Sequence, residues 1–262
     1  MEVTNLTKKR IEELIARNKR LDGRSLLEFR KIFVEKGVTK KAEGSARVRI
    51  GNTEVIAGVK LNLTEPFQDT PDEGALAVNV EFFPIGSEKF EPGPPSVEAV
   101  ELARIIDRII RESHFINLKK LCIKKGELVW MVFIDVYPIN DDGNLIDASI
   151  IASIAALKDA VFPAREEDKV KYGELTKQRL PLNDSVIGLT LYKLGQKFIF
   201  DPTTIEEEIS HARITVGMSY RKKEFIHAIQ KGGETPLSEE EIKEAIKIII
   251  KKGKEILNKI NL

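Results

Sequence analysis

Hydrophobic positions near the start of the chain recur with the period of a helix. Ile11, Leu14 and Ile15 share one face of a predicted amphipathic helix. Thr7 is its expected N-cap, because a hydroxyl there can accept a hydrogen bond from a free backbone N–H of the first turn. A turn signal at residues 22–24 follows. We therefore expect residues 1–30 to form an N-terminal arm that leads into the folded domain.

The pattern then changes to alternation of polar and β-branched residues, which is typical of strands. Residues 46–50 and 55–61 flank a short turn signal and predict a β-hairpin, and residues 77–83 predict a third strand. Residues 127–137 are almost continuously apolar, which predicts a central strand buried on both faces. The first lobe, residues 31–163, should therefore be built on a sheet.

Two helices are predicted within this lobe. Ser96 is the expected N-cap of a helix that extends to about Ser113. Apolar residues line one face of this helix, and the opposite face carries the basic residues Arg104, Arg108 and Arg111. Residues 148–162 are rich in Ala and Ile and predict a second helix, which Pro163 should stop. Its small side chains favour close packing beneath the sheet.

A charged segment, residues 164–180, separates this lobe from a second group of elements. The strands expected beyond it are residues 186–193, 198–200, 213–219 and 225–230. Ser238 and Glu241 form a capping-box pattern at the start of a final helix. Strands before helices in both halves indicate an α+β fold of two lobes, with the connector and second lobe in residues 164–262.

Composition narrows the classes of function. The chain has 42 Lys and Arg against 41 Asp and Glu, so any site for nucleic acid must be a local patch. Cys122 is the single cysteine, which rules out an internal disulfide and favours the cytoplasm. No apolar stretch is long enough to cross a membrane, so we expect no membrane partner.

Familiar cofactor and metal motifs are absent from the sequence. It has neither the glycine-rich dinucleotide motif nor a P-loop, and no spaced pairs of Cys or His that bind zinc. The three histidines are dispersed. The acidic run at residues 206–208, after Asp201, is more typical of a solvated segment than of a metal site. We therefore expect no cofactor and no metal.

Several short motifs, taken in chain order, resemble the RNase PH family. They are Arg17 with Asp22-Gly23-Arg24 and Arg30, Glu43-Gly44-Ser45-Ala46, Gly51-Asn52-Thr53, and Asp142-Gly143 before the Ala-rich helix. Four further stretches resemble the non-catalytic RNase PH-like subunits of the archaeal exosome: Phe67-Gln68-Asp69-Thr70-Pro71, Phe90-Glu91-Pro92-Gly93-Pro94-Pro95, Leu180-Pro181-Leu182-Asn183 and Asp201-Pro202-Thr203. The resemblance covers nearly the whole chain.

This resemblance implies a fold and an assembly. The fold is an RNase PH-type duplication of the kind seen in the second domain of ribosomal protein S5. The partner is a catalytic RNase PH-like subunit, and three such heterodimers close a six-membered ring. Single-stranded RNA passes through the ring, and RNA-binding cap proteins sit on it. This chain would then structure the partner's active site and help to bind RNA.

The same comparison identifies degenerate catalytic positions. Phosphorolysis brings two anions together, so it requires fixed cations and an acidic group. Adjacent arginines of the catalytic relatives correspond to Val97 and Glu98, and their phosphate-gripping turn corresponds to Gly143 with Asn144 and Leu145. Their Asp-x-Asp pair corresponds to Asp201 and Thr203, which keeps one carboxylate. The chain should therefore lack catalytic residues.

The resemblance also assigns RNA-contacting roles. Arg104 and Arg108 match positions at which the family contacts RNA, and Lys60 is a weaker candidate near another such position. From the sequence alone, a solvated helix face with Glu101 and Asp107 as ion-pair partners is the favoured interpretation, and the resemblance reverses this preference for Arg104 and Arg108.

Two other functions stay open at this point. The chain could be a phosphorolytic 3'-to-5' exoribonuclease in its own right, with Asp201 and Glu207 as acids. It could also be a small-molecule enzyme on the same fold, since a fold alone does not determine function.

Overall fold

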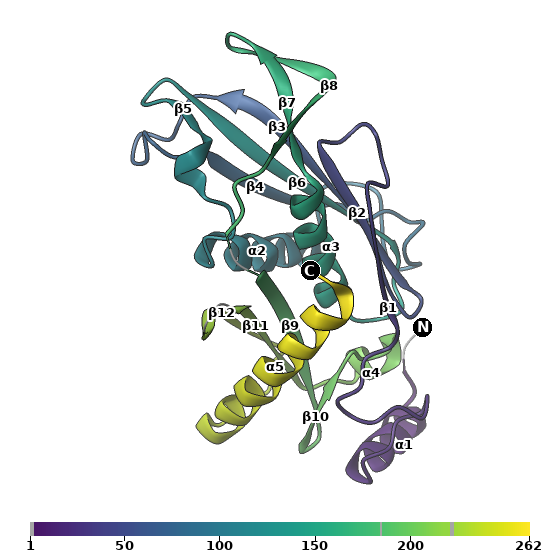
Figure 1. Ribbon diagram of the computed structural model, residues 1–262. Helices are drawn as coiled ribbons and strands as arrows, with labels where there is room; N and C mark the ends of the chain where they lie inside the picture. Colours follow the sequence, from purple (N-terminus) through teal and green to yellow (C-terminus); the bar gives the residue numbers. More distant parts are fainter. Residues whose placement is uncertain (1–2, 184, 221–222) are drawn as a thin grey trace.

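The first lobe is built on a six-stranded sheet. The computed structural model describes residues 3–183, 185–220 and 223–262. The strands of this sheet are β1 (Ile32–Lys36), β2 (Gly44–Ile50), β3 (Thr53–Thr64), β4 (Ala75–Val80), β5 (Cys122–Lys124) and β6 (Leu128–Asn140). They lie in the order β1-β2-β3-β6-β4, with β5 also paired to β6, and only β4 runs parallel to its neighbour (Figure 1). The predicted hairpin is confirmed as β2 and β3, and the third strand as β4, a few residues earlier than expected.

Strand β6 is central, as predicted, but the expectation that both faces are buried is wrong. Val132, Ile134 and Val136 are fully buried, whereas the residues between them are only half-buried. The helices of this lobe cover one face of the sheet, so the alternate side chains of β6 point to the uncovered face. Its apolar character therefore does not reflect burial on two sides.

The two helices of the first lobe are α2 (Val97–Glu112) and α3 (Leu145–Asp159), and a short 3-10 helix, η1 (Leu118–Leu121), follows α2. The Ser96 hydroxyl accepts a hydrogen bond from the N–H of Ala99, which confirms the predicted cap of α2. Helix α3 begins three residues earlier than predicted and ends at Asp159. Pro163 does not stop it, because the chain is already extended at Ala160.

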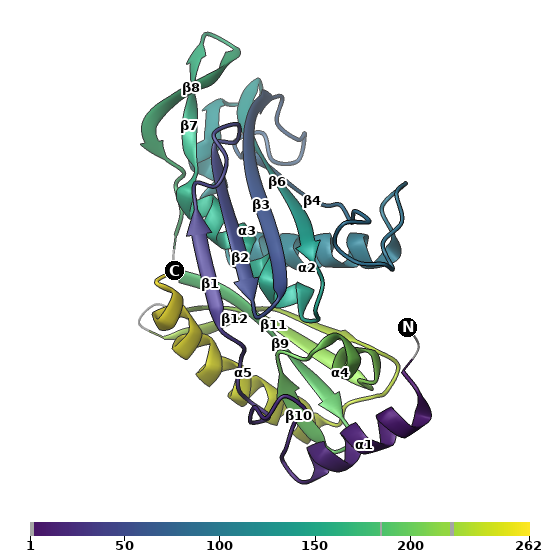
Figure 2. The same cartoon turned by 90° about the vertical axis from the view of Figure 1, so that its right-hand side faces the viewer.

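The predicted charged connector, residues 164–180, is not an irregular linker. It belongs to a hairpin of β7 (Val161–Glu166) and β8 (Lys169–Arg179), which pair antiparallel. Figure 2 shows this hairpin extending beyond the first-lobe sheet. Almost every residue of β8 is exposed, so the charged composition reflects a solvated hairpin.

The second lobe contains a four-stranded antiparallel sheet in the order β10-β9-β11-β12. Its elements are β9 (Ser185–Leu194), β10 (Lys197–Phe200), α4 (Thr204–Glu208), β11 (Ala212–Tyr220), β12 (Glu224–Gly232) and α5 (Glu239–Ile260). All four predicted strands are confirmed. The capping box of Ser238 and Glu241 at the start of α5 is also present.

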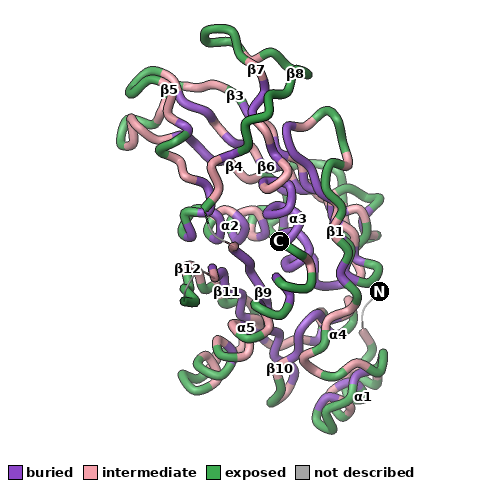
Figure 3. The backbone as a smooth tube through the Cα atoms, viewed as in Figure 1, coloured by how far each residue is buried: buried purple, intermediate pink, exposed green. Residues whose placement is uncertain are grey.

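Helices α2 and α3 lie between the two sheets, and α5 covers the outer face of the second (Figure 1). Residues 145–157 of α3 are all buried, which explains why that helix is apolar on every side (Figure 3). Gly188 of β9 and Gly217 of β11 meet the side chain of Ile109 on α2. The α+β arrangement of two sheets with helices is therefore the predicted one.

The N-terminal arm packs on the second lobe. Helix α1 (Asn5–Ala16) is capped by Thr4, one turn earlier than the predicted Thr7, whose N–H donates to the Thr4 hydroxyl. Ile11 and Ile15 are buried in a small cluster whose other buried members are Tyr192, Leu194, Ile199 and Ile209. The arm then crosses to β1, so the start of the chain connects both lobes. No helix in the described residues is long and apolar enough to cross a membrane.

The close approach of α2 to the second sheet predicts a strict size limit at Gly217. A Cβ there would lie 2.6 Å from Cγ1 of Ile109. We expect Gly217→Ala to lower the free energy of unfolding by about 1–3 kcal/mol in urea denaturation, because the core cannot absorb the methyl group. Gly58→Ala in β3 is the matched control, since its nearest neighbour would be 3.9 Å away. Equal stability of the two variants would contradict the packing argument.

Candidate functional site: a buried carboxylate and an acidic hollow

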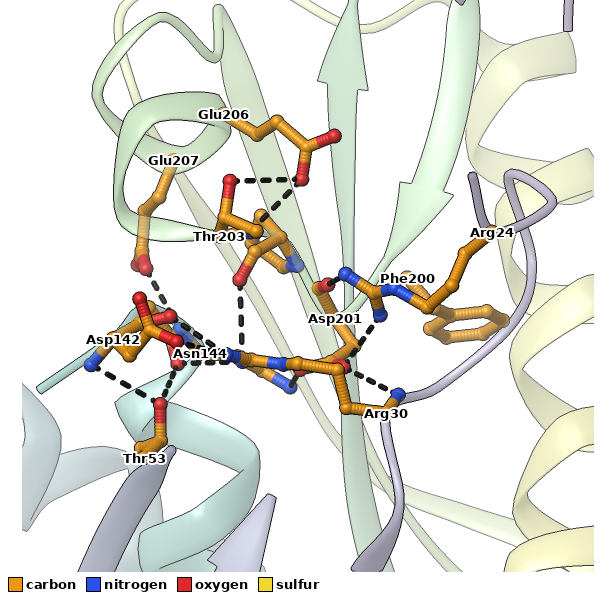
Figure 4. A network of polar contacts seen from close by, with 12 residues as sticks. Arg24, Arg30, Thr53, Asp142, Asn144, Phe200, Asp201, Thr203, Glu206 and Glu207 are labelled. Atoms are coloured by element: carbon orange, nitrogen blue, oxygen red, sulfur yellow. Dashed lines mark hydrogen bonds and ion pairs between the residues drawn. The ribbon is translucent and has the colours of Figure 1, made fainter. Parts of the chain in front are cut away.

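The side chain of Asp201 is the centre of a polar network between the lobes. Asp201 directly follows β10, has a left-handed φ of 48°, and is fully buried. Its carboxylate accepts hydrogen bonds from Arg24 Nη1 at 2.7 Å, from Arg30 Nη2 at 2.7 Å and from Arg30 Nε at 2.9 Å. The backbone N–H of Arg30 and Nδ2 of Asn144 also donate to it (Figure 4). The carboxylate is thus an acceptor on all sides.

Arg30 extends the network to the turn before α3. Its Nη1 donates to the carbonyl of Asp142 at 2.8 Å, and its Nη2 donates to the carbonyl of Gly143 at 3.0 Å. Burial by itself raises the pKa of Asp201, but hydrogen bonds from Arg30 and the charges of Arg30 and Arg24 outweigh it, so the pKa lies below its ordinary value. Asp201 is therefore an ionised structural carboxylate.

The turn before α3 requires glycine for two reasons. Gly143 has a φ of 83°, and a Cβ on it would lie 2.5 Å from the carbonyl oxygen of Pro202. Asn144 follows with a φ of 62°, and its backbone N–H donates to Glu207 at 2.8 Å. The two motifs that the sequence comparison treats as degenerate, residues 143–145 and 201–203, are thus in direct contact.

The sequence predicted that the acidic run at residues 206–208 is a solvated segment. This prediction is wrong for two of its three residues. Glu206 is buried and forms a bidentate ion pair with Arg20, which is also buried. Glu207 accepts hydrogen bonds from Tyr192 and from Asn144, and burial raises its pKa. Only Glu208 is exposed among the three. Within the described ranges, no group of His, Cys, Asp and Glu is arranged to hold a metal ion.

Two of the positions that the resemblance marks as degenerate line a hollow of about 860 Å³. Glu98 at the start of α2 and Leu145 at the start of α3 face it, together with Glu207. Two basic residues also line it, and both are paired: Lys89 with Glu208 at 3.0 Å, and Arg213 with Glu101 at 2.6 Å. We call this space the acidic hollow, because its lining carboxylates are Glu81, Glu91, Glu98, Glu101, Asp141 and Glu207.

The other positions that the resemblance marks as degenerate do not line this hollow. Val97 is 81% exposed at the first turn of α2. Thr203 caps α4, and its N–H donates to Glu206. Asp201 lies beneath the Gly143 turn and is fully buried. The structure therefore brings together Asn144, Asp201 and Thr203 in one network, and Glu98 and Leu145 in one hollow.

Arg104 and Arg108 line a second, smaller hollow of about 430 Å³ between α2 and β4, which we call the arginine groove. Arg104 is exposed and forms no hydrogen bond or ion pair with any residue that the structure describes. Arg108 donates to the side-chain oxygen of Gln230 at 3.2 Å. The helix-spaced pairing holds only in part: Arg111 binds Asp107, whereas Glu101 binds Arg213 on β11.

Lys60 does not lie with these arginines. It is in the middle of β3 and points to the sheet face that the helices leave uncovered. Its ammonium binds the carboxylate of Glu43 at 2.6 Å and the carbonyl of Lys41 at 3.1 Å, and it lies over the ring of Tyr172. These contacts give Lys60 a structural role on β3.

Sequence reasoning missed the basic residues that hold the network. Arg24 and Arg30 entered only as parts of a family resemblance, and neither Arg20 nor Arg213 was selected. Arg24 and Arg30 lie 177 and 171 residues from their partner Asp201. Arg20 lies 186 residues from Glu206, and Arg213 lies 112 residues from Glu101. The available signal was the group of three arginines in the arm, at positions 20, 24 and 30, together with the acidic residues that follow β10.

The network predicts a pH-dependent cost for Asp201→Asn. Because the folded pKa of Asp201 is lowered, its carboxylate stabilises the fold above the ordinary Asp pKa, and this contribution is lost as the pH falls through the folded pKa. We expect the variant to lose about 3–5 kcal/mol of unfolding free energy at pH 7, since two arginines lose a buried partner. Urea denaturation of both proteins from pH 7 down to pH 3 should show the difference shrinking.

Asp107→Asn is the matched control, because it also removes one carboxylate that binds an arginine. That pair is partly exposed at spacing i, i+4, so a loss of about 0.5 kcal/mol or less is expected. Similar losses in the two variants would show that burial of Asp201 does not set the cost.

Comparison with known proteins identifies the family. The model for domain 1 of the 3' exoribonuclease family matches residues 28–163, and the model for domain 2 matches residues 184–251. The "Exosome complex component Rrp42" of Methanothermobacter thermautotrophicus is 45% identical over 257 residues, which cover 97% of this chain and 94% of the relative. The resemblance drawn from the short motifs is thus confirmed.

Solved structures agree with the sequence relatives. A chain of the Archaeoglobus fulgidus exosome with RNA bound to the active site has a TM-score of 0.89 at 38% identity, over 97% of this chain and 98% of that one. A chain of an archaeal exosome core has a TM-score of 0.86 at 35% identity, over 98% and 97% of the two chains. The RNase PH-type two-lobe fold is confirmed, and the chain belongs to the 3' exoribonuclease family of RNase PH-like proteins.

Proposed function

We propose that this chain is a non-catalytic ring subunit of an archaeal exosome. It pairs with a catalytic RNase PH-like subunit, and three such heterodimers form a six-membered ring in the cytoplasm. The ring carries RNA-binding cap proteins and threads single-stranded RNA. The chain structures the partner's active site and binds RNA backbone there. Its similarity to an archaeal exosome component and to chains of solved archaeal exosomes supports membership of an exosome.

The observation that carries the non-catalytic role is the state of the basic residues in the acidic hollow. Phosphorolysis needs cations that are free to bind phosphate and the scissile phosphodiester. Lys89 and Arg213, the cations that line the hollow, are already paired with carboxylates. Asp201, the acid retained from the catalytic pattern, is buried beneath two arginines. All three groups are therefore already bound to partners within the chain.

Arg104 and Arg108 are the best candidates for RNA contact. Arg104 has no partner among the described residues and Arg108 has one neutral partner, so both guanidinium groups can bind phosphate oxygens. Such contacts hold the backbone without reading bases. Lys60 is a weaker candidate, since Glu43 already holds its ammonium.

The activity test uses phosphate-dependent release of nucleoside diphosphates from RNA. We expect no release by the purified chain and release by its mixture with the catalytic subunit, after the mass of the mixture has established a six-membered assembly. Glu207→Gln should leave the activity of the assembled ring unchanged, because Glu207 binds Asn144 and Tyr192. Release by the chain alone, abolished in Glu207→Gln, would instead favour an exoribonuclease in its own right.

The RNA-contact test uses the double variant Arg104→Ala/Arg108→Ala in the assembled ring. We expect single-stranded RNA to bind roughly tenfold more weakly at low salt, with a slope of log K against log salt that is shallower by about 1.4 for two lost phosphate contacts. The ring itself should stay assembled, since both arginines are exposed.

Lys247→Ala/Lys251→Ala on α5 is the matched control, because it removes two exposed cations at the same spacing on another helix. An equal loss of RNA affinity in both double variants would show that only the net charge of the ring matters. The specific role of Arg104 and Arg108 would then be disproved.

A further inference from the structure

Helix α2 separates two hollows of opposite charge. The arginine groove lies on one side and includes Arg104 and Arg108. The acidic hollow lies on the other and includes Glu98 and Glu101. The two hollows are neighbours, because Asn79 and Pro95 line both. An RNA backbone that reaches α2 therefore meets attraction on one side and repulsion on the other.

The acidic hollow is large enough to hold a nucleotide. Its volume of about 860 Å³ is within the range of small-molecule sites. Its walls include Phe82, Phe83 and Phe90, and Phe82 stacks on Phe90 with ring centroids 4.3 Å apart. Phe83 is 41% exposed. Aromatic rings of this kind bind bases in proteins that hold single-stranded nucleic acid, so the shape alone admits RNA.

Charge opposes entry at the mouth of the hollow. The N-terminus of α2 has the partial positive charge that ordinarily attracts phosphate. Glu98 lies in that first turn and is exposed, and hydrogen bonds from its own backbone N–H and from Ser96 lower its pKa. Glu91 is exposed in the loop before the helix and also lines the hollow. A helix end that would suit an anion is thereby occupied by carboxylates.

We propose that the acidic hollow excludes RNA, with Glu91 and Glu98 as the residues that determine this. Backbone phosphates stay in the arginine groove, and the 3' end passes this subunit and reaches the catalytic site of the partner. The exclusion rests on the proposed function, in which Arg104 and Arg108 bind RNA. It adds that the bound backbone is kept on the arginine-groove side of α2. A subunit without catalytic residues thereby avoids trapping the RNA end in its own hollow.

The test is the variant Glu91→Gln/Glu98→Gln in the ring assembled with the catalytic subunit. The probes are single-stranded oligouridylates that carry 4-thiouridine either at the 3' end or at an internal position that should lie at the arginine groove, and crosslinked peptides are identified by mass spectrometry. In the unmodified ring we expect crosslinks near Arg104 and Arg108 and none at residues 82–90. The variant should gain crosslinks at residues 82–90 and bind RNA about threefold more tightly at low salt, with the gain lost at about 0.5 M salt.

Glu240→Gln/Glu244→Gln is the matched control. Both residues are exposed on α5, and Glu240 lies in the first turn of its helix, as Glu98 does. The control should gain neither affinity nor crosslinks. Crosslinks at residues 82–90 in the unmodified ring, or an unchanged pattern in the variant, would overturn the exclusion. If Arg104→Ala/Arg108→Ala still weakens binding in that case, the exclusion fails while the proposed RNA contact stands.

Discussion

One buried carboxylate, Asp201, joins the three parts of the chain. Removing a carboxylate from water costs several kcal/mol, and only charged partners and hydrogen bonds can offset that cost. The arm supplies Arg24 and Arg30, and the turn before α3 supplies Asn144. These partners come from the arm and the first lobe, and Asp201 itself belongs to the second lobe, so the carboxylate is satisfied only when the arm and both lobes are in their final positions. The same contact that stabilises Asp201 therefore fixes the relative placement of the lobes.

This constraint also determines what the carboxylate can do chemically. It accepts five hydrogen bonds, and its lowered pKa makes it a poor proton donor. An aspartate that acts as an acid or a metal ligand needs a free lone pair or a proton to give. Asp201 has neither, although the resemblance matches it to one carboxylate of the catalytic Asp-x-Asp pattern. A residue type that matches a catalytic pattern therefore does not by itself indicate the chemistry of that pattern.

Local patterns in the sequence predicted local structure well. The caps at Ser96 and Ser238, the β2–β3 hairpin and the strands of the second lobe depend on residues close together in the chain, and all are present. Local errors were small, since the cap predicted at Thr7 is Thr4 and the helix expected to stop at Pro163 ends at Asp159. The larger errors concern long-range contacts. The apolar run in β6 gave no indication of which sheet face the helices cover, and the charge of residues 206–208 gave no indication of the arginine that buries Glu206. The resemblance marked six positions as degenerate, but only tertiary contacts place three of them in the network, two in the hollow and Val97 at an exposed site.

Under the proposed non-catalytic role, the positions that the resemblance marks as degenerate do more than lack catalytic groups. Asn144 occupies a left-handed turn and is bound to Asp201 and Glu207, so it contributes to stability in its present form. Leu145 faces a hollow that is rich in carboxylates. An arginine placed there would share this space with Glu98 and Glu207. Carboxylates would still outnumber cations in the lining, so one restored cation would not reverse the charge that an approaching phosphate meets.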